Sequence, residues 1–413
     1  MKRRDFLKLA GAVSLAGCAT PVPSKARVVV IGGGFGGATA AKYIRLWDPS
    51  IDVVLVERES AFVSCPISNL VLGGFTGMQE ITHGYDALRR HGVQVVRDEV
   101  VAIDADKRSV RLAGGNNLGY ERLVVSPGVD FMFGDIEGYA AGMAAGRVLH
   151  AWKAGEQTAA LRRALEAMPD GGVYLLSVPT APYRCPPGPY ERISMVAAYF
   201  KASKPRSKVL VLDANPDVTS KGPLFKRAWS ELYPGIIDYR GNAKVVAVES
   251  GAVRTEFDTV RGDVLNVVPP HRAADIAAKS GLITTNNRWC DVDWRTMESK
   301  AVKGVHVLGD ATLSAPGMPK SGSMANNHAK IAAAAIVAQL NGRSPESPKI
   351  INTCYSFVSG KEAIRVSSVH DWEPGQGTLV PVKGAGGVSA ARSEAEGTFA
   401  WNWARTIWAD SLA

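Results

Sequence analysis

The chain contains 413 residues, of which 46% are hydrophobic, and its formal net charge is +9. This length allows two or three domains with a sizeable core. The sequence has no uncharged apolar run of about eighteen or more residues, which argues against a membrane-spanning helix. Basic residues form no long runs and do not alternate with aromatic residues. The charge therefore argues against nucleic-acid binding and favours an acidic partner protein.

Residues 1–18 predict an export signal that is not part of the fold. Arg3 and Arg4 form a twin-arginine motif, and a short, weakly apolar stretch follows. A short cytoplasmic N-terminal helix is the alternative. Because the twin-arginine pathway exports folded proteins, we expect a periplasmic protein that takes up its cofactor before export. Residues 15–18 also match a lipobox, in which Cys18 would carry a lipid anchor, and an ordinary cleavage site with an incidental cysteine is the alternative.

Residues 27–57 match the pattern of a dinucleotide-binding unit. A strand at 27–31 leads into a glycine-rich loop at 32–37, and an alanine-rich helix and a second strand, 52–56, follow. The glycine pattern alone is a weak signal. It becomes a strong one when both strands, the helix and a terminal acid lie at the expected spacing around it. We therefore predict that this segment holds a pyrophosphate at the N-terminus of the helix.

Four residues of this unit have expected roles. Gly32 makes the turn, Gly34 lets the pyrophosphate approach the backbone, and Gly37 lets the helix pack closely against the strand. Glu57 ends the second strand, twenty residues after Gly37. Its carboxylate would accept hydrogen bonds from the adenosine ribose.

A second signal identifies the nucleotide as FAD. A strand ends in Gly309 and Asp310, and an aspartate in this place can accept hydrogen bonds from the ribityl hydroxyls. A generic strand and turn is the alternative. A long alanine-rich helix at 321–340 follows Lys320, and its N-terminus would aim a positive dipole end at the flavin pyrimidine. We assign Gly309, Asp310 and Lys320 to the FAD site.

Residues 171–213 predict a second unit of the same kind with a different loop. A strand at 172–178, a helix near 190–201 and a strand at 208–213 have the expected order, but the loop between the first two carries five prolines and no glycine pattern. Prolines stiffen this loop and prevent close approach of a phosphate. The place where a nicotinamide nucleotide would deliver electrons instead presents Cys185.

The cysteines after Cys18 are few and dispersed. They are Cys65, Cys185, Cys290 and Cys354, and none has metal-ligand spacing, so we expect no metal site. The chain also lacks a C-x-x-C-H motif, so it carries no c-type haem of its own. Disulfides are permitted in the expected oxidising compartment, and Cys290 is predicted to be a buried thiol without a role.

The chain resembles the flavoprotein subunit of flavocytochrome c sulfide dehydrogenase, a disulfide-reductase-like FAD protein. The motifs that carry the resemblance are Gly32–Lys42, His83–Asp86, His150–Thr158, Arg184–Glu191, Met318–Gly322 and Asn352–Ser356. The segments R-C-P-P-G-P-Y-E and N-T-C-Y-S are the most specific of these, since no general nucleotide enzyme needs them. The resemblance implies three domains, oxidation of sulfide to sulfur, and a separate c-type cytochrome subunit that holds the haem and receives the electrons.

The resemblance also implies residue roles. Cys185 and Cys354 match the redox-active disulfide that faces the flavin, and Glu191 matches the acid beside it. Cys65 matches the cysteine that binds the 8α carbon of FAD through a thioether. The sequence departs from the family pattern here, because Pro66 and its neighbours replace an aromatic-rich segment.

The chemistry can also be derived from the residues. A disulfide sulfur is electrophilic, so hydrosulfide can open the bridge to a persulfide and a thiolate, which can pass two electrons to the flavin. Glu191 could take the proton. The alternatives are a purely stabilising crosslink between Cys185 and Cys354 and, for Glu191, a surface charge favoured by the helix dipole.

The predicted fold class is α/β, with two Rossmann-like domains and a small C-terminal α+β domain. The FAD domain is discontinuous, at 26–138 and 263–343, and encloses a NAD-like domain at 139–262 that carries the redox cysteine but lacks a nucleotide loop. Residues 344–413 form the C-terminal interface domain. Aromatic residues cluster at 399–408, which is typical of a core or an interface, with a membrane anchor as the alternative.

Three other functions compete with a sulfide:cytochrome c oxidoreductase. A sulfide:quinone reductase would share the sulfur chemistry, but its membrane-binding basic C-terminal helices do not match this tail. A type II NADH dehydrogenase needs a second glycine loop. An accessory flavoprotein of a sulfur-oxidising complex could keep the disulfide as a switch.

Overall fold

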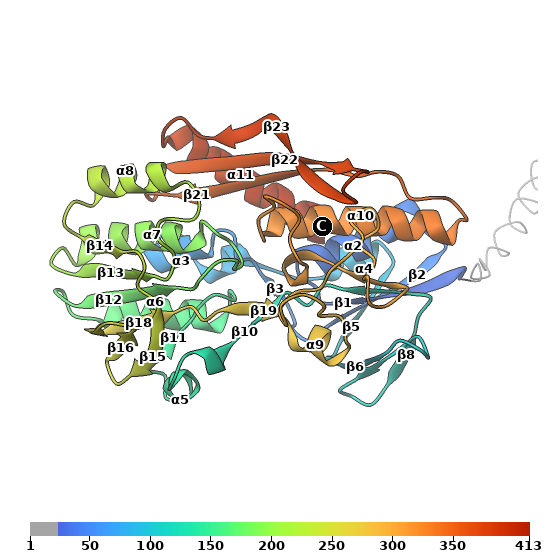
Figure 1. The fold of residues 1–413 in the computed structure, drawn as a ribbon, viewed down its shortest axis with the longest axis horizontal. Coiled ribbons are helices and arrows are strands. Elements are labelled where there is room, and N and C mark those ends of the chain that lie inside the picture. Colours follow the sequence, from blue (N-terminus) through green and yellow to red (C-terminus); the bar gives the residue numbers. More distant parts are fainter. Residues whose placement is uncertain (1–23) are drawn as a thin grey trace, which may run out of the picture.

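The computed structural model describes residues 24–413, so the predicted export signal and Cys18 lie outside the described residues. Two lobes built on parallel sheets lie side by side, and an antiparallel sheet from the C-terminal part lies across both of them (Figure 1). This arrangement confirms the predicted α/β class with two Rossmann-like units and a C-terminal α+β domain.

The first lobe is built on a five-stranded parallel sheet. Its strands, in spatial order, are β20 (Val305–Val307), β9 (Arg122–Val125), β1 (Ala26–Ile31), β2 (Ile51–Glu57) and β5 (Val93–Arg97). The central strands are runs of valine, isoleucine and leucine with almost no exposed surface, as expected for a sheet covered on both faces. The other elements of this part are α2 (Phe35–Trp47), α3 (Ser68–Gly73), α4 (Asp86–Arg90), α9 (Asp275–Lys279), α10 (Gly322–Leu340), the β3–β4 pair (Phe62–Val63 and Thr82–His83) and the β6–β7–β8 sheet (Val100–Asp104, Ser109–Leu112 and Asn117–Gly119).

The second lobe repeats the plan with another five-stranded parallel sheet. Its order is β11 (Val148–Leu149), β18 (Val264–Val267), β12 (Val173–Val178), β13 (Lys208–Asp213) and β14 (Ile237–Arg240). The strands and helix expected between 172 and 213 are β12, α7 and β13. The helices are α5 (Tyr139–Ala144), α6 (Glu156–Ala167), α7 (Gly188–Ser203) and α8 (Gly222–Leu232), and a small sheet comprises β15 (Val245–Glu249), β16 (Ala252–Thr255) and β17 (Thr259–Arg261).

The second domain boundary differs from the one predicted at residue 263. Strand β18 pairs with β11 and β12, so it belongs to the second lobe. The chain returns to the first lobe through β19 (His271–Ala273), which pairs with β10 (Val129–Phe131). The glycine that suggested the boundary, Gly262, instead lies just after β17, where its N–H donates to the carbonyl of Gly251 and continues the pairing of β16 with β17. The sequence of a buried apolar strand does not indicate which of two parallel sheets the strand joins, so the boundary was placed too early.

The C-terminal part comprises β21 (Lys349–Phe357), β22 (Ala363–Glu373), β23 (Thr378–Val388) and α11 (Glu394–Leu412). The end of α11 is fixed to the first lobe, where Lys42 Nζ donates to the carbonyls of Ala409 and Asp410. The aromatic residues of α11 are divided between core and surface, since Trp408 is 7% exposed and Phe399 is 54% exposed. Within residues 24–413, no helix combines the length and apolarity that a membrane crossing requires.

Candidate flavin and thiol site

The glycine loop after β1 has the geometry that its sequence predicts. Gly32 has φ 92°, and a Cβ there would lie 2.4 Å from the carbonyl oxygen of Ser126. A Cβ on Gly37 would lie 1.8 Å from the oxygen of Gly32, so only glycine allows α2 to pack this closely on the strand. A Cβ on Gly34 would meet nothing within 4 Å. The backbone at the N-terminus of α2 is therefore open to a ligand, as phosphate binding requires.

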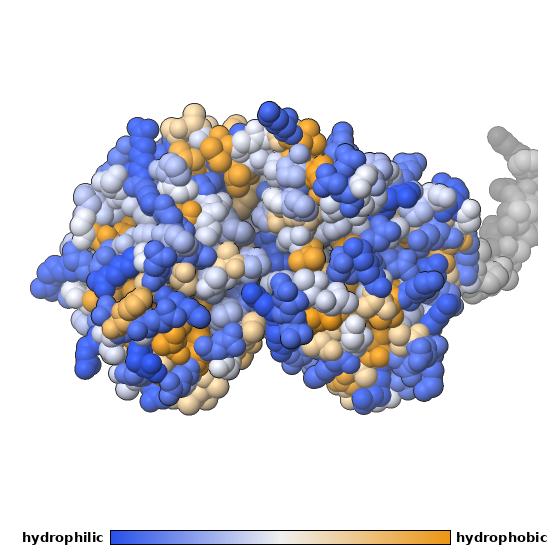
Figure 2. Space-filling view, viewed as in Figure 1, coloured by the Kyte–Doolittle hydropathy of each residue, from blue (hydrophilic) through white to orange (hydrophobic). Residues whose placement is uncertain are grey.

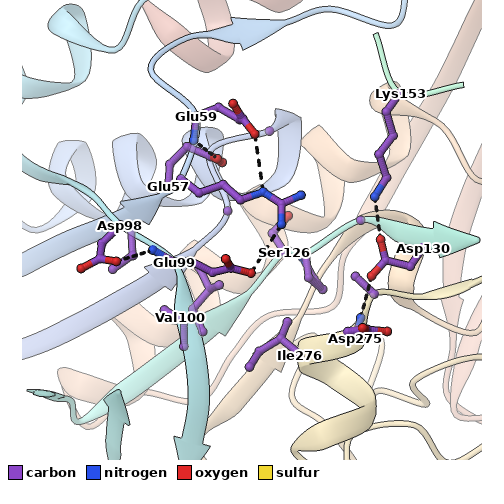
Figure 3. A pocket seen from close by; sticks show the side chains of 18 residues that line it. Glu57, Glu59, Asp98, Glu99, Val100, Ser126, Asp130, Lys153, Asp275 and Ile276 are labelled. Atoms are coloured by element: carbon purple, nitrogen blue, oxygen red, sulfur yellow. Dashed lines mark hydrogen bonds and ion pairs between the residues drawn. The ribbon is translucent and has the colours of Figure 1, made fainter. Parts of the chain in front are cut away.

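A cavity begins at this loop and extends along the ends of the strands (Figure 3). Glu57 lines it, with Oε2 accepting from Gly33 N at 2.6 Å and Oε1 accepting from Glu59 N at 2.8 Å. On its other side, Lys153 Nζ lies 2.6 Å from Asp130 Oδ1. The carboxylate of Glu57 thus lies where the fold places the ribose of a bound dinucleotide.

A second cavity adjoins the first and contains the cysteines. Gly34, Ser126, Gly128 and Lys153 line both cavities, so together they form one elongated space. The second part is lined by three thiols and by the turn after β20, contributed by Cys65, Cys185, Cys354, Gly309 and Asp310. Residues 321–323 also line it, so the N-terminus of α10 opens onto the cavity as expected.

Asp310 provides a test of whether this space fits FAD. Its Oδ1 is buried and finds no hydrogen-bond partner within residues 24–413. Burial raises the pKa of this carboxyl, while the charges of Arg184 and Lys320 act in the opposite direction. A buried acceptor without a partner at a cavity calls for a donor, and the ribityl hydroxyls of FAD supply donors. The residues present fit FAD.

Lys320, which was expected to bind FAD, does not line either part of the cavity. Its ammonium donates to the carbonyl oxygens of Asp310, at 3.1 Å, and Thr312, and it lies 3.7 Å from the ring centre of Trp289. Burial lowers the pKa of Lys320 to about 7. Its own carbonyl accepts from Cys185 N at 2.8 Å. Lys320 therefore supports the Asp310 turn and the cysteine loop from behind the cavity wall.

Cys185 is held in an unusual backbone conformation just before α7. Its φ is 59°, in the left-handed region that residues other than glycine rarely adopt. Its carbonyl accepts from Gly188 N at 2.8 Å, and a Cβ on Gly188 would lie 2.9 Å from Cys185 Sγ. Burial raises the pKa of the thiol well above its usual range, and Cys354 and Glu191 raise it further.

Cys354 reaches the same cavity from strand β21 of the C-terminal part. Burial raises the pKa of its thiol, Lys221 lowers it and Glu191 raises it. All four cysteines between residues 24 and 413 are free thiols, so the predicted Cys185–Cys354 disulfide is not formed in this structure. The structure brings both sulfurs to one cavity wall, and the bond between them stays a prediction. Cys290 is fully buried elsewhere, in the core of the first lobe.

Glu191 is buried, which excludes the alternative of a surface charge. It is 9% exposed, and its carboxylate accepts from Asn69 Nδ2 and from Phe357 N, both at 2.7 Å. Burial raises its pKa, and these two hydrogen bonds act in the opposite direction. Glu191 lies behind the cysteines and connects α3, α7 and β21. Its role as proton acceptor stays a prediction.

Two cationic residues near the thiols were assigned no role from the sequence. Burial alone would lower the pKa of Arg184, but negative charge on Cys65, Asp310 and Cys185 outweighs it and raises the value. Lys221 is 7% exposed and donates from the second lobe to β21. Arg184 adjoins Cys185 in a motif, whereas Lys221 comes from a loop that shows no pattern.

The nucleotide position of the second lobe is filled by the protein's own side chains. Asp213 ends β13 as Glu57 ends β2, but it is fully buried. Its Oδ2 accepts from the hydroxyls of Tyr190 and Tyr239, both at 2.8 Å, and its Oδ1 accepts from Asn215. The acid that would bind a ribose in a dinucleotide unit thus binds two tyrosines.

The fold and these residues define the pyridine nucleotide-disulfide oxidoreductase class of flavoproteins, and residues 26–165 match the family model described as "Pyridine nucleotide-disulphide oxidoreductase". Residues 158–269 match "Sulfide dehydrogenase [flavocytochrome c] flavoprotein chain, central", and residues 346–412 match "Flavocytochrome c sulphide dehydrogenase, flavin-binding". The flavocytochrome c sulfide dehydrogenase flavoprotein chain of Chlorobaculum thiosulfatiphilum is 69% identical over 45 residues, which are 94% of that sequence and 11% of this one. The chain belongs to the family of flavocytochrome c sulfide dehydrogenase flavoprotein chains.

More distant relatives share a larger part of the chain. The mitochondrial sulfide:quinone oxidoreductase of Mus musculus is 25% identical over 302 residues, which are 69% of this chain and 65% of that protein. The chain thus spans slightly less than two thirds of this relative's length. The solved sulfide:quinone oxidoreductase of Aquifex aeolicus superposes with a TM-score of 0.76 at 19% identity, covering 93% of this chain and 91% of the other, which shows a common fold.

Proposed function

We propose that this chain is a periplasmic FAD-dependent sulfide dehydrogenase that passes electrons to a separate c-type cytochrome subunit. The observation that carries the proposal is the second cavity, which Cys185 and Cys354 both line together with the Asp310 turn. The absence of a glycine loop in the second lobe supports a sulfur donor over a nicotinamide donor. Family membership and the sulfide-oxidising relatives support sulfide as the substrate.

The proposed reaction uses two cysteines that line the cavity and the buried acid behind them. Hydrosulfide forms a bond to one sulfur of the Cys185–Cys354 disulfide as the S–S bond breaks, and the other sulfur leaves as a thiolate with the electron pair. Glu191, whose pKa burial raises, accepts the proton. Bound FAD supplies a two-electron acceptor and, attached at Cys65, would remain with the protein. Gly32, Gly34, Gly37, Glu57 and Asp310 would hold it.

The surface of the C-terminal part supports docking of a partner protein. Its exposed large apolar side chains include Ile351, Val382, Val388 and Phe399. Figure 2 shows apolar surface at the top of the molecule, over the C-terminal sheet. Non-obligate interfaces combine such residues with a polar rim. A cytochrome subunit seated here would receive the electrons.

The mouse relative makes quinone a second candidate acceptor. Helix α11 argues against it, since Arg405 is its only basic residue, whereas membrane-surface helices are rich in lysine and arginine. Sulfide-dependent reduction of a c-type cytochrome and of a soluble quinone, measured with the same purified protein, separates the two. We expect reduction of the cytochrome alone. Faster reduction of the quinone would favour the second candidate. If sulfide reduces neither acceptor and does not bleach the flavin, the result would favour an accessory flavoprotein.

The compartment is tested separately by cell fractionation. Protein with its natural N-terminus should appear in the periplasmic fraction or, if Cys18 is acylated, in the membrane fraction. Arg3→Lys together with Arg4→Lys should leave it in the cytoplasm. Export of this double variant at the original level would reject the twin-arginine route.

A further inference from the structure

Lys221 is a buried cation that connects two domains at the thiol pair. It lies just before α8 in the second lobe and is 7% exposed. Its Nζ donates to Ser356 Oγ at 2.8 Å and to the carbonyl of Cys354 at 3.3 Å, both on β21. Neither acceptor carries a charge. A buried ammonium without a counter-ion is unfavourable, so this position favours negative charge nearby.

The groups that can supply this charge are the two cysteines and Glu191. The charges that raise the pKa of Lys221 against burial are, in order, those of Cys354, Glu191 and Cys185, followed by that of Glu396. Conversely, Lys221 is the main group that lowers the pKa of Cys354. Arg184 lowers the pKa of Cys185, but its charge is shared with Cys65 and Asp310. The two sulfurs are therefore electrostatically unequal, and Cys354 is better suited to carry a negative charge.

We propose that Lys221 makes Cys354 the leaving sulfur of the disulfide and thereby directs hydrosulfide to Cys185. The hydrosulfide sulfur bonds to Cys185 Sγ, which yields a Cys185 persulfide. The S–S bond breaks, and its electron pair leaves with Cys354 Sγ as a thiolate facing the Lys221 ammonium. Thiol–disulfide exchange is faster when the leaving thiolate is more stable. This inference rests on the proposed function and adds the direction of attack.

A second buried lysine in the same lobe provides a matched control. Lys204 is 9% exposed and donates to the carbonyls of Glu166, at 2.7 Å, and Met168, at the end of α6. It therefore secures a helix end without facing a thiol. Lys204→Met removes a buried ammonium as Lys221→Met does, and it separates a loss of packing from a loss of charge at Cys354.

The direction of attack can be measured without any variant. The oxidised holoprotein is mixed with one equivalent of sulfide, denatured in acid, alkylated and digested, and mass spectrometry then locates the persulfide. We expect it on Cys185. A persulfide predominantly on Cys354 would overturn the inference and leave the proposed function intact. Sulfide that modifies neither cysteine would overturn the proposed function, and the inference with it.

The role of Lys221 is measured by the rate of disulfide opening in the same quenched reaction at equal flavin content. We expect Lys221→Met to slow opening on the order of 10-fold through the poorer leaving group. Lys221→Arg should restore most of the rate, and Lys204→Met should leave it unchanged. Opening at the wild-type rate in folded Lys221→Met, or equal slowing in Lys204→Met, would reject the role. If Lys221→Met does not fold, Lys221→Gln replaces it in the same measurement. Slow opening in folded Lys221→Gln would support the role, and opening at the wild-type rate would reject it.

Discussion

The two lobes share one βαβ plan, but they differ at the point where that plan places a ligand. In the first lobe a glycine loop precedes α2, and Glu57 lines an open cavity. In the second lobe a proline-rich loop precedes α7, and Asp213 is buried under two tyrosine hydroxyls. Open parallel sheets bind ligands beyond the carboxyl ends of their strands. The topology fixes where a ligand can lie. The loop at that position decides whether the site is open to a nucleotide or presents a cysteine instead.

This comparison predicts the largest effect for the cysteines. Cys185→Ser and Cys354→Ser should each lower sulfide-dependent cytochrome reduction by several orders of magnitude, because a two-sulfur relay fails when either sulfur is missing. Bound FAD should be unchanged. Turnover is compared at equal flavin content, and Cys290→Ala, which removes a thiol in the core of the first lobe, should retain near-native activity.

A structural crosslink would behave differently from a redox disulfide. Its removal would lower the free energy of unfolding by about 2–5 kcal/mol and leave turnover per folded molecule nearly intact. Near-native activity in either Cys185→Ser or Cys354→Ser would therefore reject the relay.

The first lobe is expected to keep its nucleotide through acid precipitation. Cys65 lines the cavity that contains Asp310, so a thioether to FAD is within reach of the site. Flavin should remain in the protein pellet, and Cys65→Ser should release it to the supernatant. Free FAD from the wild-type protein, or unchanged retention in Cys65→Ser, would contradict the attachment.

The terminal acids of the two lobes should respond in opposite ways. In a Cys65→Ser background, Glu57→Gln should weaken FAD binding about 10-fold, as expected for one lost charge-assisted hydrogen bond, and barely change apoprotein stability. Asp213→Asn should leave FAD affinity unchanged and lower the free energy of unfolding by about 1–3 kcal/mol, because it disturbs buried hydrogen bonds to Tyr190 and Tyr239. Flavin titration and urea unfolding measure the two quantities. If Glu57→Gln and Asp213→Asn changed FAD affinity equally and the free energy of unfolding equally, the two acids would not have different roles.

The smallest expected effect concerns Glu191 and pH. Burial raises its pKa in the folded protein, so its protonated form favours folding, and this contribution is lost as pH rises through the raised value. The stability of wild type relative to Glu191→Gln should therefore fall as the pH rises from about 4 through the raised pKa. Thermal unfolding across this range measures the difference, with the exposed Glu256→Gln as control. A difference that grows with pH would contradict the assignment.

Local patterns were sufficient to predict both βαβ units and much of the flavin cavity. Glycine spacing, strand periodicity and the terminal acid are all encoded within about thirty residues. The roles of Gly32, Gly34 and Gly37 follow from backbone geometry, so they could be inferred before the structure was known. The pairing of Cys185 with Cys354 came from family resemblance, since no local pattern connects them.

The remaining features depend on contacts between distant segments. Lys221 acts through β21, more than one hundred residues later in the chain, and no periodicity marks it. The motif containing Lys320 has a sequence signal, but only the fold shows that its side chain donates to two carbonyls and does not line the cavity. Strand β18 joined the second sheet because its partners β11 and β12 lie there. Such outcomes depend on the assembled fold.

The most direct test of the central claim compares sulfide and NADH as reductants of the bound flavin. In a stopped-flow experiment without an electron acceptor, sulfide should bleach the visible flavin absorbance rapidly. NADH at the same concentration should leave it unchanged, because the 179–191 loop has no glycine-lined phosphate cradle and Asp213 is already bound to tyrosines. Rapid bleaching by NADH, or no bleaching by sulfide, would contradict the account.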